Sequence, residues 1–167
     1  MEMESLCHPF PAIYAPDSRI LILGSFPSVK SREQMFFYGH PQNRFWRVMA
    51  ALLSTDVPQT VEEKRAFLLA NHIALWDVIA SCDIAGSSDA SIRNAVPSDL
   101  TPILETASIR QIFTNGGTAH RLYRKYIYPL TGREDTVLSS TSPANAARSL
   151  DALIDAWQPV REALKEE

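Results

Sequence analysis

Residues 19–46 constrain the fold of this chain more than any other segment. The segment opens with an unbroken apolar run, Ile20-Leu21-Ile22-Leu23, which is typical of a buried β-strand and ends at Gly24. A long loop with hydroxyl, amide, aromatic and basic side chains follows, and the chain then enters a predicted helix at about Asn43. Because ligands of open α/β sheets bind beyond the carboxyl ends of the strands, this loop is predicted to form a functional site.

Strands and helices alternate along the rest of the chain. We expect strands at 19–24, 73–78, 109–114 and 135–139. We expect helices at 43–53, at 60–70 with a capping box at Thr60, at 98–106 with Ser98 as the cap, at 117–128 and from about 148, where Pro159 should kink the last helix or start a new one. Alternation of this kind implies parallel pairing. The predicted fold class is therefore α/β: a three-layer α/β/α sandwich with a central four-stranded parallel sheet.

The remaining segments are expected to lack regular structure. Residues 1–18 contain three prolines and no apolar period, so we interpret them as an irregular lead-in to a single domain that spans 1–167. Residues 80–97 are polar and are expected to form a long loop, which in a compact domain is usually functional or mobile. Since parallel strands end at the same edge of a sheet, four polar loops should converge there: 24–42, 79–97, 115–117 and 139–145.

Composition narrows the class of protein. The chain has 167 residues, of which 46% are hydrophobic and 21% charged, as in an ordinary globular protein, and its apolar runs are far shorter than a membrane span. Its two cysteines, Cys7 and Cys82, give no disulfide framework, which favours a reducing cytoplasm. The four histidines have no partner at metal-ligand spacing and no carboxylate cluster appears, so we expect no metal and no cofactor.

The net charge of −3 argues mildly against a nucleic acid partner, but the distribution of charge matters more. Basic side chains gather around the opening segment, namely Lys30, Arg32, Arg44 and Arg47. A second basic cluster consists of Arg121, Arg124 and Lys125. From charge alone, a basic binding face and ordinary solvated helix faces are equally good interpretations.

The turn Gly24-Ser25-Phe26-Pro27-Ser28 does not fit three familiar motifs. It lacks the three spaced glycines of a dinucleotide-binding fingerprint and the Gly-Lys-Ser/Thr ending of a P-loop. It also fails the Gly-x-Ser-x-Gly spacing of a nucleophile elbow. Taken alone, it is a tight turn from a strand into a loop.

Two motifs together resemble the uracil-DNA glycosylase superfamily. The first is this turn followed by His40-Pro41-Gln42-Asn43-Arg44-Phe45-Trp46. The second is Ser140-Thr141-Ser142-Pro143-Ala144-Asn145, which is similar to the loop with which that superfamily enters DNA. In detail the chain looks like the hypoxanthine-DNA (deoxyinosine) glycosylase family, over roughly 19–157. The resemblance implies the α/β/α fold of that superfamily and a glycosylase activity on DNA.

The first motif departs from the superfamily pattern at Phe26. Most members have an Asp or Asn inside this turn that positions or activates water, and phenylalanine cannot orient water. The resemblance implies that Asn43 takes over as the catalytic residue, and Asn115 at the end of the third strand is the second candidate. A carboxamide supplies one donor and one acceptor, which suits the edge of an oxo-purine. The alternatives are that Asn43 caps a helix and that Asn115 is a turn residue before glycine.

The other candidate site residues divide between the base and the DNA. The residues expected to form the base-binding pocket are Gly24, Ser25, Phe26, Pro27, Ser28, Tyr38 and His40. The residues expected to bind DNA are Arg44, Ser140, Thr141, Ser142, Pro143, Ala144, Asn145 and Arg148. Three structural alternatives stay open: His40 in a structural turn, Ser142 as an ordinary helix cap, and Asp89 as a surface turn residue, which we favour over a place in the pocket.

The predicted function is that of a monofunctional DNA glycosylase. It would hydrolyse the N-glycosidic bond of a deaminated base, chiefly hypoxanthine, in base excision repair, without a lyase step because no lysine lies within the motifs. The expected partner is double-stranded or single-stranded DNA with a damaged base, and we expect no membrane contact. We further expect a cytoplasmic monomer that works at the bacterial nucleoid. The alternatives are a uracil or thymine mismatch-specific glycosylase and a non-catalytic module that binds nucleotides or damaged DNA.

Overall fold

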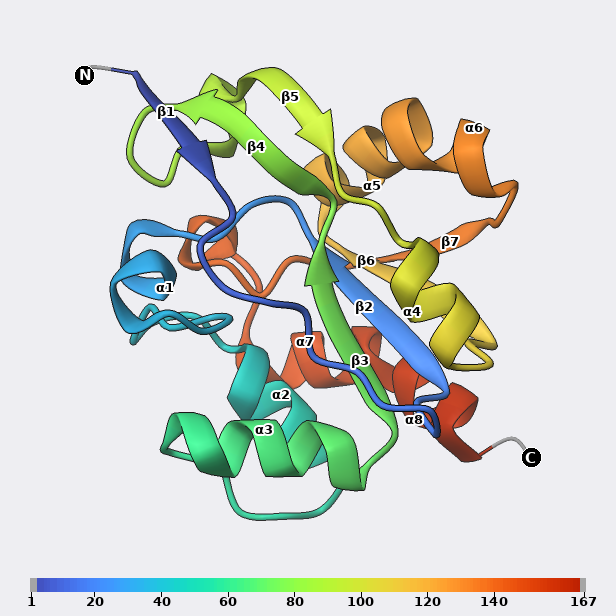
Figure 1. Ribbon diagram of the computed structural model, residues 1–167. Coiled ribbons are helices and arrows are strands. Elements are labelled where there is room, and N and C mark those ends of the chain that lie inside the picture. The colour runs from blue at the N-terminus through green and yellow to red at the C-terminus, as the bar shows by residue number, and fades with distance from the viewer. Residues whose placement is uncertain (1–2, 166–167) are drawn as a thin grey trace.

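The fold is organised around a four-stranded parallel sheet (Figure 1). The computed structural model describes residues 3–165. In spatial order the strands are β3 (Ile73–Asp77), β2 (Ile20–Gly24), β6 (Gln111–Asn115) and β7 (Asp135–Leu138). All four strands were predicted from the sequence, and their parallel pairing is confirmed. The register places Gly24 beside Asp77 and Asn115 beside Leu138, so these residues end their strands at the same edge of the sheet.

Helices cover both faces of this sheet, which confirms the three-layer arrangement (Figure 1). Alternate residues of β2 face opposite ways: Ile20 and Ile22 belong to one core, and Leu21 and Leu23 to the other. The first face is covered by α2 (Phe45–Leu52), α3 (Val61–Ala70), α7 (Leu150–Ala156) and α8 (Gln158–Lys165). The second is covered by α4 (Thr101–Thr106), α5 (Gly117–Leu122) and a π-helical turn (Tyr123–Ile127) that continues into α6 (Tyr128–Thr131). Burial on both sides explains why β2 is apolar throughout.

A second sheet, of three antiparallel strands, corrects two sequence predictions. Its strands are β1 (Glu4–Cys7), β4 (Ile79–Ile84) and β5 (Arg93–Pro97), with β4 in the middle. Residues 1–18 are therefore not irregular throughout, and most of 80–97 is not a loop. Only Val78 separates β3 from β4, so this sheet continues the central one beyond the end of β3 (Figure 1). No local pattern indicates this sheet, because β1 and β5 are mostly exposed and β1 pairs with a strand far along the chain.

The helix ends agree with the sequence in two places and correct it in two others. The predicted capping box is present: the Thr60 hydroxyl accepts the N–H of Glu63 at 3.0 Å, and the Glu63 carboxylate accepts the N–H of Thr60 at 3.0 Å. A new helix starts at Gln158, just before Pro159, as expected. Ser98 is not a cap, because α4 begins at Thr101 and Asp99 accepts its N–H at 2.9 Å. A short helix that was not predicted, α1 (Val29–Gln34), lies inside the opening loop.

Candidate active site

A cavity of about 350 Å³ lies at the carboxyl ends of the parallel strands. All seven predicted base-pocket residues line it: Gly24, Ser25, Phe26, Pro27, Ser28, Tyr38 and His40. Both candidate catalytic residues, Asn43 and Asn115, line it too, as do Ser140, Thr141, Ser142, Pro143 and Ala144 of the second motif. Arg44, Asn145 and Arg148 are not in its wall. The polar loops that follow the parallel strands therefore meet at one cavity, as the parallel pairing predicted.

Gly24 has to be glycine because two side chains crowd it. A Cβ atom at this position would lie 2.5 Å from Oδ1 of Asp77 and 3.1 Å from the hydroxyl of Tyr38. Real Cβ atoms do not tolerate the first of these distances. The first residue of the motif therefore serves to let a carboxylate and a phenol approach the same point of the cavity.

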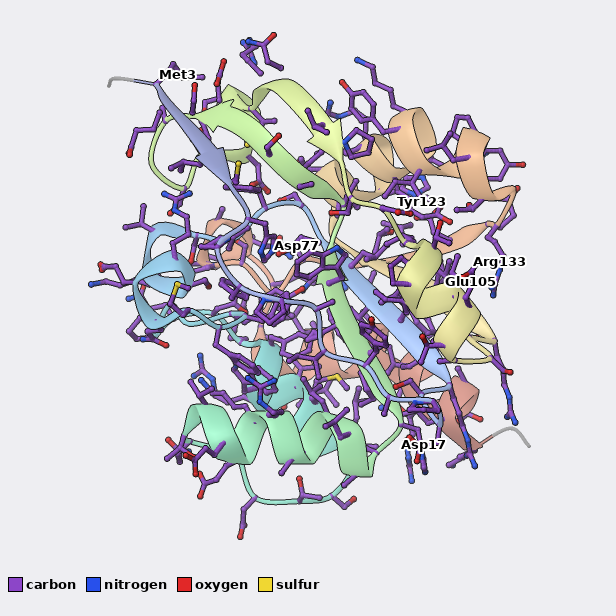
Figure 2. All side chains as sticks on the ribbon, in the orientation of Figure 1. Met3, Asp17, Asp77, Glu105, Tyr123 and Arg133 are labelled. Carbon is purple, nitrogen blue, oxygen red and sulfur yellow. The ribbon has the colours of Figure 1, made fainter. Side chains whose placement is uncertain are left out.

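Asp77 is a buried carboxylate in the cavity wall that the sequence analysis did not single out (Figure 2). Its Oδ2 lies 2.7 Å from Nε2 of His8, and the two side chains are only 5% and 3% exposed. The His8 ring is enclosed by aromatic rings, with centroid distances of 4.2 Å to Trp76 and 4.6 Å to Phe10. Asp77 could have been found as the polar residue that ends an apolar strand. His8 could not, because it reaches the site through the pairing of β1 with β4.

Tyr38 contributes a ring and an unpaired hydroxyl to the cavity. Its ring is stacked on that of Phe45, with 4.2 Å between centroids, and its backbone is left-handed, with φ of 53°. The hydroxyl is buried and has no hydrogen-bond partner among the described residues. Burial, together with the charge of Asp77, raises the pKa of Tyr38 far above its usual range, and the nearby Asn115 side chain, which is too poorly placed for a hydrogen bond, opposes the rise only in part. The group therefore stays protonated and can donate a hydrogen bond to a ligand.

Asn115 fastens the second-motif loop to the sheet. Its Nδ2 donates to the Thr141 hydroxyl at 3.0 Å, and its Oδ1 accepts the N–H of Thr141 at 3.1 Å. The left-handed turn that follows is formed by Gly116, whose φ is 100°, and not by Asn115 itself. Both functional groups of this carboxamide are engaged, so its geometry suits a residue that positions the loop beside the cavity.

Asn43 combines a helix-capping contact with a place in the cavity wall. Its Oδ1 accepts the N–H of Phe45 at 2.9 Å, and its own N–H donates to the carbonyl of His40 at 2.9 Å. No hydrogen bond joins its Nδ2 to the described part of the chain. The N-cap of α2 is Arg44, so Asn43 is not the cap itself but accepts the N–H of the first helical residue from one position earlier, while the other end of its carboxamide is left for the catalytic interpretation.

Arg44 braces the second-motif loop from outside the cavity. Its guanidinium donates to the carbonyl of Asn145 at 3.0 Å and to that of Arg148. Its backbone N–H donates to the carbonyl of Thr141 at 3.1 Å. Asn145 closes the loop on itself by donating to the carbonyl of Ser140 at 2.9 Å. The loop that follows β7 is thus held by contacts at both of its ends.

Asp89, His40 and Ser142 each had a structural alternative, and their positions bear on it. Asp89 lines the cavity, so the surface interpretation that we favoured is wrong. Burial raises the pKa of its carboxyl; a hydrogen bond from Ser25 opposes that rise and the charge of Asp77 adds to it. Nδ1 of His40 accepts the N–H of Gln42 at 3.0 Å, as in a structural turn, and the Ser142 hydroxyl accepts the N–H of Ala144 at 3.1 Å.

Residues 3–165 contain neither a cluster of metal-ligand side chains nor a long apolar helix. No group of three His, Cys, Asp or Glu side chains in this range is placed to hold a metal ion. None of the helices there is long and apolar enough to cross a membrane.

Comparisons with known proteins agree with the motifs and the fold. The profile of the Uracil DNA glycosylase superfamily matches residues 11–164. A protein named hypoxanthine DNA glycosylase from Methanosarcina acetivorans is 35% identical over 138 residues, which cover 81% of this chain and 86% of the relative. One of the same name from Methanosarcina barkeri is 30% identical over 149 residues, which cover 89% and 93%.

The fold comparison gives the same result. A solution NMR structure from Methanosarcina acetivorans, assigned provisionally as a uracil DNA glycosylase, superposes with a TM-score of 0.79 at 33% identity. The superposition covers 94% of this chain and 97% of the other. With a matching profile, matching relatives and a matching structure, the chain belongs to the uracil-DNA glycosylase superfamily and, within it, to the family of the hypoxanthine DNA glycosylases.

Proposed function

We propose that the protein is a monofunctional DNA glycosylase that releases a deaminated base, chiefly hypoxanthine, from DNA. The observation that carries the proposal is the cavity at the strand ends, where aromatic and polar side chains meet the second-motif loop, which is similar to the loop with which this superfamily enters DNA. A glycosylase must take its target base out of the stack and hold it in such a pocket. The two Methanosarcina relatives bear the name of this activity.

The walls of the cavity suit a flipped base. Phe26, Phe37 and Tyr38 supply aromatic surface, and stacking on such rings contributes about 1–3 kcal/mol per base in single-strand systems. Hydroxyl and amide groups from the two motifs supply hydrogen bonds at the rim. Ser140 and Ser142 can donate to phosphate oxygens, which positions the DNA without reading its sequence.

Cleavage of the bond between base and sugar is assigned to water. In the proposed reaction the water oxygen attacks the sugar carbon and forms a C–O bond, the C–N bond breaks, and the base leaves with the bonding electrons and takes up the proton that the water loses. The transition state resembles an oxocarbenium ion, by analogy with glycoside hydrolysis. Nδ2 of Asn43 is assigned to hold the water, since this group lines the cavity and Oδ1 is used by Phe45. No described residue that lines the cavity is a lysine, which supports a reaction without a Schiff base.

The partner is proposed to be DNA with a damaged base, double-stranded or single-stranded, bound by a cytoplasmic monomer. The test is base release from labelled duplexes that carry one deoxyinosine or one deoxyuridine, without metal, followed by alkaline cleavage of the strand. Faster cleavage at inosine than at uracil is expected. Cleavage at uracil alone would identify a mismatch-type enzyme instead, and tight binding without cleavage would identify a non-catalytic module.

A further inference from the structure

The buried pair of His8 and Asp77 is not used by the reaction proposed above. A carboxylate that is 5% exposed is costly to bury unless its oxygens are hydrogen-bonded. Oδ2 of Asp77 has its partner in Nε2 of His8, 2.7 Å away. Oδ1 has none among residues 3–165, and it lies at the point where Gly24 leaves room in the cavity wall. One oxygen is therefore held, and the other is presented to whatever enters the cavity.

The surroundings of His8 determine which group donates. Nδ1 of His8 is buried and has no partner in the described part of the chain. A carboxylate oxygen can only accept, so the proton of this hydrogen bond is on Nε2 and points at Asp77. His8 donates to Asp77 and holds it as an acceptor.

Deamination turns one ring nitrogen of the base from a hydrogen-bond acceptor into a donor. In adenine and cytosine, the ring nitrogen beside the amino group is an acceptor. In hypoxanthine and uracil, the same nitrogen carries a proton and is a donor, beside a carbonyl oxygen. A fixed anionic acceptor attracts the second pattern and repels the first. A donor at the neighbouring point would match the carbonyl oxygen, and the unpaired hydroxyl of Tyr38 lies there.

The position of Asp77 along the sheet suits contact with the edge of the base that carries this ring nitrogen. The strand order is β3-β2-β6-β7, so Asp77 ends one edge strand and the second-motif loop follows the other. The loop is fastened to Asn115 at the end of β6, two strand spacings from Asp77, or roughly 10 Å. A base that enters from the loop therefore points its far edge, away from the sugar, toward Asp77.

We propose that Asp77 reads the ring N–H that deamination creates, that His8 positions it, and that this contact excludes adenine and cytosine from the cavity. The inference rests on the proposed function and assigns the chemistry by which the site recognises its substrate class.

The test is Asp77→Asn, which changes one oxygen to an NH2 group without changing the shape of the side chain. Because His8 still donates from Nε2, the amide oxygen should stay on the His8 side and the NH2 group should face the cavity. The acceptor becomes a donor. We expect single-turnover release of hypoxanthine to fall roughly 10- to 150-fold, and the ratio of hypoxanthine to adenine release to fall by at least as much.

The controls separate recognition from folding and from DNA binding. Affinity for a duplex with a tetrahydrofuran abasic analogue should be unchanged, since no base is present. Asp56→Asn, at an exposed carboxylate outside the cavity wall, should leave release rates unchanged. If Asp77→Asn does not fold, the wild-type protein on a duplex with N1-methylhypoxanthine, which lacks the N–H, serves instead and should release it at least tenfold more slowly than hypoxanthine.

Two outcomes would overturn the inference. An unchanged hypoxanthine-to-adenine ratio in Asp77→Asn, whatever the absolute rates, would show that Asp77 does not read the base. Equal release of hypoxanthine and its N1-methyl derivative by the wild type would show the same. Failure of the wild type to release any deaminated base would instead remove the proposed function, and the inference with it.

Discussion

At the scale of single residues, Gly24 is the position with the least freedom. Gly24→Ala should push Asp77 and Tyr38 apart, because its Cβ would lie 2.5 Å from Oδ1 of Asp77. We expect a loss of about 1–3 kcal/mol in the free energy of unfolding, as for other overpacked sites, together with a loss of base release. Urea unfolding and the release assay measure the two effects. Gly117→Ala, whose Cβ would meet nothing within 4 Å, is the matched control and should change neither.

Asn43 is expected to have two separable roles. Asn43→Ala removes the acceptor for the N–H of Phe45, so the free energy of unfolding should fall by about 0.5–2 kcal/mol, and base release should be lost while DNA binding persists. Asn43→Ser keeps a capping oxygen but not the amide donor. It should restore the stability without restoring release. Unchanged release in Asn43→Ala would refute the catalytic assignment.

Asp89 should destabilise the folded protein at neutral pH. Burial raises the pKa of its carboxyl, so the folded state holds the proton more readily than the unfolded chain does. Stability therefore falls as the pH rises from the usual range of an aspartate, about 3.9, toward the folded pKa. Asp89→Asn should raise the melting temperature at pH 7, and the gain should disappear below about pH 4. A gain that is constant over this range would mean that titration of Asp89 is not its cause.

At the scale of elements, the loop that follows β7 depends on Arg44. The hydrogen bonds of its guanidinium go to the carbonyls of Asn145 and Arg148, so Arg44→Ala should loosen the loop and weaken DNA binding. A brace of this kind releases no counterions, so the slope of log affinity against log salt should stay the same. A slope flatter by about one unit would show that Arg44 contacts a phosphate.

The sequence predicted the elements whose signal is local. The four parallel strands were visible because each contains consecutive apolar residues, although only Val137 and Leu138 in β7, and α3 because its capping box lies within four residues. The strands β1 and β5 were missed because their side chains are mostly exposed, and β4 because Ser81 and Asp83 interrupt its buried residues. The pairing of β1 with β4 also joins distant parts of the chain. Local pattern does not carry information of that kind.

At the scale of the whole molecule, the same distinction decides which site residues could be predicted. The two motifs and the topology of a parallel sheet were enough to bring Asn43, Asn115 and the second-motif loop to one cavity. Asp77 could be reached by the same reasoning, since it ends a strand. His8 could not be predicted, because its position depends on a second sheet that no local sequence pattern indicates.

The pairing of His8 with Asp77 also bears on the order in which the protein can be completed during synthesis. The two residues are 69 positions apart, which at 5–20 residues per second is a delay of roughly 3–14 s on the ribosome. Until Asp77 and β4 have been made, the segment that carries His8 has no strand to join. The loop after β7 is made later still. A nascent chain therefore has no complete pocket, and the ability to tell a damaged base from a normal one should appear only after the last strand of the sheet has been added.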